Sequence, residues 1–479
     1  MKSALAGLLA LSLGACAALP TSRALDPQAE ARAFAARSLG NRGLAASEAR
    51  FGLSAGANAP WTPDRITVAA WYFDPALAQA RATAARAQAE AAVAAQRANP
   101  TLRLGPEKVF GGLSGASPWT IGVALLLPML HPGESAARGE IAAADTQAAR
   151  DRLAQAVWQS RANAVAALRG VLLARHAQAL AETAAHVDNA LLDAAQQRVA
   201  AGEDDRGDLL AAQFDTQRAA SALATRRAQR IAAEHALAAA MGVPVAALND
   251  AKLEWPQLET PPPPTALPPA ALAEDAAWNR IDLAALLERY RTAEAQLRLA
   301  AGARYPATSI APGYLYDQGQ RKLTFGVDVE LPLFHGADAR IRAAAAARDE
   351  AAAAARARQA TILNQLDAAR ADYAQRYAAW QRMARAAQAA QSETARAAAS
   401  RKAGQSDRRA ELTARVASAS AALAAQDALS AALNSLGRLE DVLQRPLWPA
   451  SRLTAATAAG AQSASDHNAF SGGRDGHSF

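Results

Sequence analysis

Side chains that commonly carry out chemistry are few and scattered in this chain of 479 residues. It has one cysteine, seven histidines and four methionines, and no two histidines stand four residues apart. Neither the phosphate-binding sequence GxxxxGK[ST] nor HExxH occurs. We therefore expect neither an enzyme nor a resident metal or cofactor. His131 and His335 recur at equivalent positions beside turns, where we expect them to end strands.

The single cysteine, Cys16, stands at a position suited to acylation. A basic start and an apolar stretch over 4–13, followed by small residues, are typical of a secretory signal peptide. The sequence Leu-Gly-Ala-Cys at 13–16 resembles the bacterial lipobox, and Ala17 after it implies sorting to the outer membrane. We expect residues 1–15 to be removed and Cys16 to be lipidated. The alternative is an ordinary signal peptide with a chance cysteine.

The remainder of the chain reads as two copies of one unit. A proline-rich stretch at 256–270 cannot be helix interior and predicts an extended linker. Landmarks recur on both sides of it at offsets of 206, 204 and 202 residues: Pro100 and Pro306, Pro128 and Pro332, Gly202 and Gly404. A steady offset of this size indicates a duplicated structural unit.

Long helices are predicted in both halves. Apolar residues larger than alanine recur at helical spacing, alanine is abundant, and only 5% of residues are aromatic. The expected helices are 71–98, 134–201 and a last one to about 242, then 271–303, 337–402 and a last one to about 443. A helix of 68 residues spans about 100 Å. We expect two long antiparallel hairpins, each with its shorter helices stacked end to end beside the long one.

Short β segments precede each long helix. Residues 323–331 alternate, with Leu323, Phe325, Val327, Val329 and Leu331 on one face. The counterpart 120–128 places Ile121, Val123, Leu125 and Leu127 on the matching face. Their predicted partner strands are 308–316 and 101–109.

These strands have the length that a tilted strand needs to cross a bilayer, about nine to eleven residues. Trp119, Tyr314, Tyr316 and Phe334 fall near strand ends, as an interfacial aromatic belt would. Open sheet edges are costly in lipid and membrane barrels have about eight strands or more, so several copies must pool their strands. The alternative is a soluble pair of β-hairpins packed on helices.

The order of these landmarks resembles that of the outer membrane efflux proteins, the TolC-like channels. The resemblance covers about residues 70–446, and strand pairs ending in Pro-x-x-His before a long helix carry part of it. The sequence at 198–202 with Asp208-Leu209-Leu210 and Gln213 is similar to the family's first tip, and 401–404 with Glu411-Leu412 resembles the second. The entry Asn-Pro-Thr-Leu at 99–102 is most similar to outer membrane components of heavy-metal efflux systems.

The resemblance implies a fold that is mainly α with a small β part. Three chains would form a hollow α-barrel from tandem repeats of long antiparallel helices, and their four strands each would make a 12-stranded transmembrane β-barrel. The homotrimer would be a passive conduit in the outer membrane, and its tips would meet a periplasmic adaptor linked to an inner membrane pump. Basic and acidic residues are interleaved, so the net charge of +7 does not indicate nucleic-acid binding.

Family channels close at the helical tips, and Gly202 and Gly404 lie where tight helix reversals need glycine. The first tip is more charged than is usual in the family. Gate or adaptor contacts are expected among charged residues after these glycines: Asp205, Arg206, Asp208, Asp407, Arg408 and Arg409. Exposed pairs are worth about 0–1 kcal/mol each, but a ring of them can bias a two-state gate. Adaptor docking or simple solubility would explain these charges equally.

The strand faces imply two further surfaces. Asp328 and Glu330 would give the barrel lumen an acidic band, or simply a solvated inner wall. The lipid-facing residues would be Ile121, Val123, Leu125, Phe325, Val327 and Val329.

The predicted organisation has six parts. They are a signal peptide (1–15), a lipidated extension (16–70), the first repeat (71–255), the linker (256–270), the second repeat (271–446) and a disordered tail (447–479). The competing function is a lipid-anchored periplasmic helical scaffold without a pore.

Overall fold

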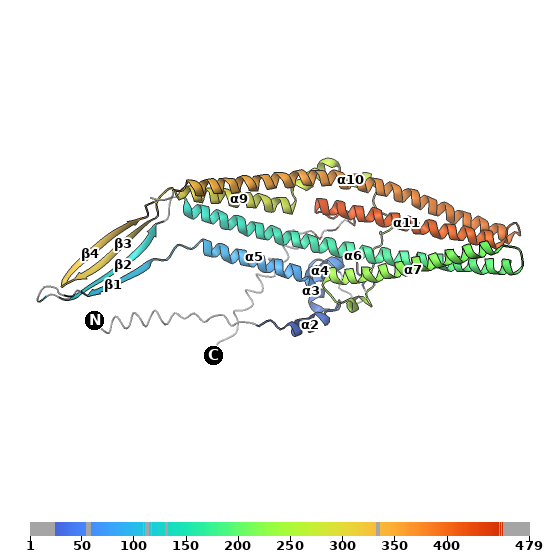
Figure 1. Cartoon of the computed structure of the whole chain (residues 1–479), viewed down its shortest axis with the longest axis horizontal. Coiled ribbons are helices and arrows are strands. Elements are labelled where there is room, and N and C mark those ends of the chain that lie inside the picture. The colour runs from blue at the N-terminus through green and yellow to red at the C-terminus, as the bar shows by residue number, and fades with distance from the viewer. Residues whose placement is uncertain are drawn as a thin grey trace.

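The computed structural model describes residues 24–53, 59–108, 110, 115, 117–129, 133–331, 336–449, 451 and 453. The protein is an elongated bundle of helices with a small sheet at one end and two hairpin tips at the other (Figure 1). Six helices form the bundle: α5 (Pro75–Ala94), α6 (Glu134–Ala200), α7 (Arg206–Met241), α9 (Ile281–Gly302), α10 (Asp338–Lys402) and α11 (Arg408–Leu443).

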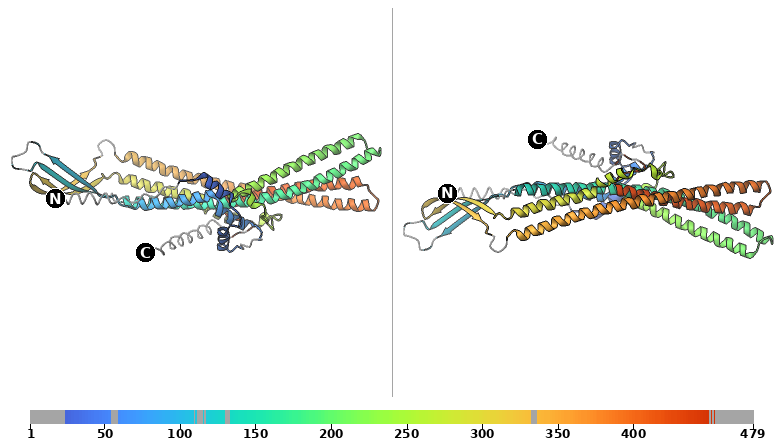
Figure 2. Two further views of the ribbon diagram at one scale, coloured as in Figure 1. Left: turned by 90° about the horizontal axis from the view of Figure 1, so that it is seen from below. Right: turned by 90° about the horizontal axis from the view of Figure 1, so that it is seen from above.

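The two long helices, α6 and α10, contain 67 and 65 residues and begin and end close to the predicted positions. α5 and α7 both pack against α6, while α9 and α11 pack against both α6 and α10. The shorter helices therefore lie end to end beside the long ones, as the matching lengths predict. Figure 2 shows this arrangement from two opposite sides.

Both of the predicted shorter helices that precede the strands are interrupted. The segment 71–98 is divided into α4 (Pro63–Phe73) and α5, because Pro75 cannot continue a helix and Asp74 caps the next one through Ala76 N. The segment 271–303 is divided into α8 (Ala270–Trp278) and α9. Here the break coincides with a contact between residues distant in the sequence, because the amide of Ile281 donates to Gln444 Oε1 at 2.8 Å.

Glycine ends both long helices in the same way. Gly202 and Gly404 have φ of 76° and 71°, in the left-handed region. The amide of Glu203 donates to Arg198 O, and that of Gln405 donates to Ser400 O. These bonds across the last helical turn define a Schellman cap at each tip, as predicted for the two glycines.

The four strands form one antiparallel sheet in the order β1-β2-β3-β4. The strands are β1 (Thr101–Lys108), β2 (Trp119–Met129), β3 (Thr308–Asp317) and β4 (Gln320–Val329). The β2–β3 pairing joins the two repeats. β1 and β4 therefore each have one open edge in the described chain.

The last strand begins and ends earlier in the chain than the predicted range 323–331. Gln318 and Gly319, with φ of 49° and 100°, make a two-residue turn, so β4 begins at Gln320 opposite Asp317. β4 ends at Val329 opposite Thr308, where β3 begins. Glu330 and Leu331 thus lie beyond the strand, although the amide of Glu330 donates to Ala307 O at 2.9 Å.

A small helical domain lies beside the middle of the bundle (Figure 1). It contains α2 (Pro27–Ala35), α3 (Arg42–Arg50) and α4, and its core continues into α6, α7 and α11. Trp71 Nε1 donates to Val157 O at 3.0 Å, and Arg37 donates to the carbonyls of Phe73 and Gly242. The sequence did not reveal this domain.

The beginning of the predicted tail belongs to this domain. Trp448 stacks on Trp255 with ring centroids 5.2 Å apart, and Leu453 is buried. The prediction of a disordered tail from residue 447 onward is therefore wrong for Trp448 and Leu453. Residues 454–479 lie outside the described chain. The proline-rich linker is bonded to α10, because Tyr373 donates to Pro262 O and Arg370 donates to Pro268 O.

Among the helices of the described residues, α11 alone is long and apolar enough to cross a membrane by length and composition. This evidence is weak, because core helices of soluble proteins pass the same test. α11 packs against α6, α8 and α10.

Candidate channel surfaces

The sheet has one continuous apolar face. Strand register places Ile121 beside Tyr316, Val123 beside Tyr314 and Val327 beside Ile310. The predicted set Ile121, Val123, Leu125, Phe325, Val327 and Val329 thus shares one face. This face is uncovered, because Leu323, Phe325 and Val327 are 90%, 69% and 56% exposed.

The opposite face is smaller and more polar. Asp317 accepts hydrogen bonds from Thr120 Oγ1 at 3.1 Å and Lys322 Nζ at 2.7 Å, and Ser309 Oγ lies 3.5 Å from Asp328. Asp328 belongs to this face, whereas Glu330 lies outside β4 and does not extend the predicted pair of acids along the strand.

An ion-pair network connects the two hairpins near their tips. Arg198 in α6 holds Asp204 through Nε and Nη2 at 3.0 and 3.1 Å. Arg409 in α11 donates to the same Asp204 at 2.8 Å and to Asp208 at 3.4 Å. The hydrogen bonds from Arg198 are the main reason that the pKa of Asp204 lies below its usual value.

Several of the predicted tip residues form ion pairs or cap helices. Asp208 pairs with Arg409, and Asp407 lies 3.5 Å from Arg198. Asp205 and Asp407 cap the returning helices, accepting from the amides of Asp208 and Ala410.

Arg206 and Arg408 form no ion pair within the described part of a single copy, and their role as gate or adaptor contacts stays a prediction. The sequence prediction missed Arg198 and Asp204, which hold the network together. A second missed cluster surrounds Glu411 of α11, which pairs with Arg401 of α10 and with Arg415 of its own helix. The Arg401 pair connects α10 to α11.

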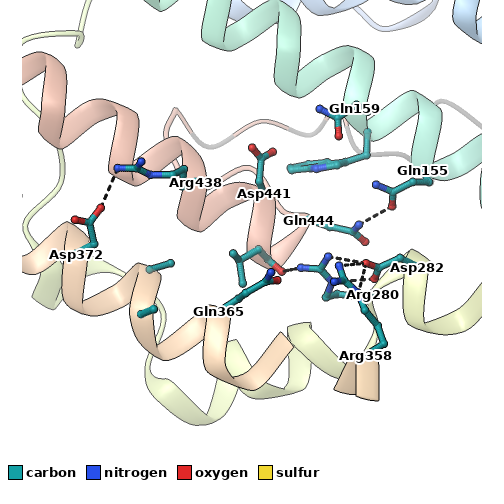
Figure 3. A pocket seen from close by; sticks show the side chains of 14 residues that line it. Gln155, Gln159, Arg280, Asp282, Arg358, Gln365, Asp372, Arg438, Asp441 and Gln444 are labelled. Atoms are coloured by element: carbon teal, nitrogen blue, oxygen red, sulfur yellow. Dashed lines mark hydrogen bonds and ion pairs between the residues drawn. The ribbon is translucent and has the colours of Figure 1, made fainter. Parts of the chain in front are cut away.

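A pocket of about 560 Å³, lined mainly by Gln, Arg and Asp residues, lies where α11 ends and α9 begins, between α6 and α10 (Figure 3). Arg280 and Arg358 both donate to Asp282, and Gln444 donates to Gln155 Oε1 at 2.6 Å. Burial by itself raises the pKa of Asp282, but the arginine hydrogen bonds outweigh it and hold the pKa at about 2. These contacts connect the ends of the stacked short helices to both long helices.

A smaller cavity of about 190 Å³ adjoins this pocket and is lined by Arg161, Arg169 and Glu440. Glu440 accepts the amides of Leu447 and Trp448 at 2.6 and 2.8 Å. Burial raises the pKa of Glu440 and lowers those of Arg161 and Arg169. Within the described residues, the Nε atoms of both arginines have no hydrogen-bond partner.

Some predicted residues lie outside the described chain: Cys16, His131, His335 and Phe334. The described residues include no group of three or more histidine, cysteine or acidic side chains that could hold a metal.

The arrangement defines a class of protein: long helical hairpins that end in an antiparallel four-stranded sheet. Residues 72–243 match the sequence model of the family described as "Outer membrane efflux protein". This match agrees with the resemblance read from the sequence. No curated protein matches the sequence at significance.

Solved structures share the fold. The outer membrane protein VceC of Vibrio cholerae is 19% identical with a TM-score of 0.64, over 80% of this chain and 95% of that one. The MtrE outer membrane channel of Neisseria gonorrhoeae is 18% identical with a TM-score of 0.65, over 80% and 88%. CusC is 16% identical with a TM-score of 0.64, over 81% and 95%.

Proposed function

We propose that this chain is the outer membrane channel of a tripartite efflux system. Copies assemble into a tube that passively exports small molecules or metal ions delivered by an inner membrane pump through a periplasmic adaptor. The observation that carries the proposal is the sheet, which has an uncovered apolar face, a more polar face and two open edges.

The sheet supports assembly because an isolated copy cannot satisfy its edges in lipid. All pairings are antiparallel and there are four strands, so β1 and β4 run in opposite directions. β4 of one copy can therefore continue the sheet onto β1 of the next with antiparallel pairing. Three copies give the twelve strands that the family resemblance implies, more than the eight of the smallest such barrels.

The helices support the periplasmic part of the proposal. α6 at 67 residues is about 100 Å long, so the tips lie far from the sheet. A ring of tip ion pairs, three Asp204 networks in a trimer, would bias the inner end toward closure, and adaptor binding there would open it.

A lipid on Cys16 is part of the proposal. α4 meets α6 at Val157, 23 residues beyond Glu134, which is about 35 Å along the helix. The eleven residues from Cys16 to Pro27 reach at most about 36–40 Å when extended. An anchor at Cys16 is thus compatible with a membrane at the level of the sheet.

Conductance of the purified acylated protein in planar bilayers tests the function. We expect stepwise openings from a complex with the mass of three chains. A complex of that mass that stays electrically silent would favour the scaffold without a pore. Replacement of Cys16 by serine should abolish incorporation of labelled palmitate, and retained label would contradict the anchor.

A further inference from the structure

Charges are segregated between the two faces of the sheet. The three acidic side chains of the strands, Glu107, Asp317 and Asp328, all lie on the face opposite Phe325. The apolar face carries two charges, Lys108 and Arg321, and both are basic.

Both cations lie at the same end of the sheet. Lys108 is the last residue of β1, which follows α5, and Arg321 is the second residue of β4, which leads to α10. They thus occupy the end remote from the helices (Figure 1). If the helices are periplasmic, this end reaches the outer leaflet.

Aromatic rings accompany the cations. Lys108 is directly opposite Trp119, with Nζ 5.8 Å from the ring centroid, and Arg321 is directly opposite Tyr316. Such rings mark the boundary between hydrocarbon and headgroups. Basic side chains at that level extend toward the phosphates of lipid headgroups.

Neither cation has an acidic partner in the described chain, and both are exposed. The neighbouring Lys322, which points to the other face, is paired with Asp317 at 2.7 Å. Charge complementarity on the apolar face is therefore unmet, and an anionic group from the surrounding lipid would meet it.

We propose that Lys108 and Arg321 bind phosphate groups of outer-leaflet lipid, namely lipid A. This inference rests on the proposed function, because the sheet must be embedded in a barrel. Both residues lie on edge strands, so Arg321 of one copy and Lys108 of its neighbour flank the same seam. The binding site is complete only where two copies meet.

The test is titration of the purified, acylated, full-length complex in detergent with lipid A, followed by native mass spectrometry. The double variant Lys108→Gln with Arg321→Gln should bind about tenfold more weakly or worse. The matched control, Arg103→Gln with Lys322→Gln, removes the same charge from the opposite face and should retain wild-type affinity. The charge-conserving double variant Lys108→Arg with Arg321→Lys should retain it too.

Any of three results would overturn the inference. They are an equal loss of affinity in the control, no loss in the first double variant, and equal binding of dephosphorylated lipid A. Conductance and complex mass are recorded for every variant. If the wild-type complex conducts but shows no preference for phosphorylated lipid A, only this inference is wrong. If the wild-type protein forms neither pores nor a multimer, the proposed function is wrong as well.

Discussion

Asp204 of the first hairpin accepts a hydrogen bond of 2.8 Å from Arg409 of the second hairpin. The side chain of Asp204 is 7% exposed and that of Arg409 is 41% exposed. Because Arg198 also holds Asp204, one carboxylate connects α6, its tip turn and α11.

Asp204→Asn should raise leak through the closed channel severalfold, because the amide cannot accept charge-assisted bonds from both arginines. Single-channel recording without an adaptor, or uptake of a large antibiotic by cells, measures the leak. Arg408→Gln is the matched control and should leave it unchanged, since Arg408 has no ion pair in the described chain. Equal leak in both variants would show that the Asp204 network does not hold the gate.

Asp282→Asn should lower the free energy of unfolding at pH 7 by about 1–2 kcal/mol. The pKa shift alone corresponds to about 2.4 kcal/mol, and partial exposure of Asp282 to solvent reduces this value. The folded pKa of about 2 is below the usual 3.8. The stabilisation is therefore complete only above about pH 5, and it disappears as the pH falls from there through about 2. Denaturant unfolding of wild type and variant at pH 7, 4, 3 and 2 measures this.

The difference between wild type and Asp282→Asn should shrink across that window. Asp275→Asn, which removes an exposed carboxylate without an ion pair in the described chain, serves as the control. A difference that stayed constant down to pH 2 would show that the two arginines do not act through the charge of Asp282.

Gly242→Ala should destabilise the protein by about 1–3 kcal/mol, because Gly242 has φ of 70° and a Cβ there would lie 2.7 Å from the backbone oxygen of Phe73. Gly139→Ala, in a helix with open space around the site, should stabilise by up to about 1 kcal/mol. Thermal unfolding of both variants checks the opposite signs. Similar shifts in both would contradict the close approach of the Phe73 backbone to Gly242 at the end of α7.

Val327→Arg should sharply reduce the amount of assembled outer membrane complex. A basic residue on the lipid face costs about 2–4 kcal/mol per chain near the bilayer midplane, and every copy carries it. Asp328→Arg, one residue further on the opposite face, should assemble normally. Quantifying the complex in membranes by its mass on gels compares them, and equal assembly of both would contradict the assignment of faces.

The elements that the sequence predicted well are those with strong local signals. The long helices, the Schellman caps at Gly202 and Gly404, and the strand faces follow from spacing, glycine and alternation. The break before α9 depends on Gln444, 163 residues from Ile281. Such contacts leave no local pattern.

The tip network illustrates the same limit. Clustered charges indicated that salt bridges form near Gly202 and Gly404, but Arg408 and Arg409 cannot be distinguished without knowing how the hairpins cross. The side domain was missed because α2 and α3 are short, and their packing partners are distant in the sequence.

The central claim is that β4 crosses lipid with its odd-numbered side chains outward and its even-numbered ones toward water. Single cysteines at positions 324 to 329, with Cys16 acylated, can be labelled in intact outer membranes by a membrane-impermeant thiol reagent and by a lipid-soluble one. The account predicts that positions 324, 326 and 328 react with the impermeant reagent and that 325, 327 and 329 react only with the lipid-soluble one. Ready reaction of 325, 327 and 329 with the impermeant reagent would contradict it, because these residues would then face water.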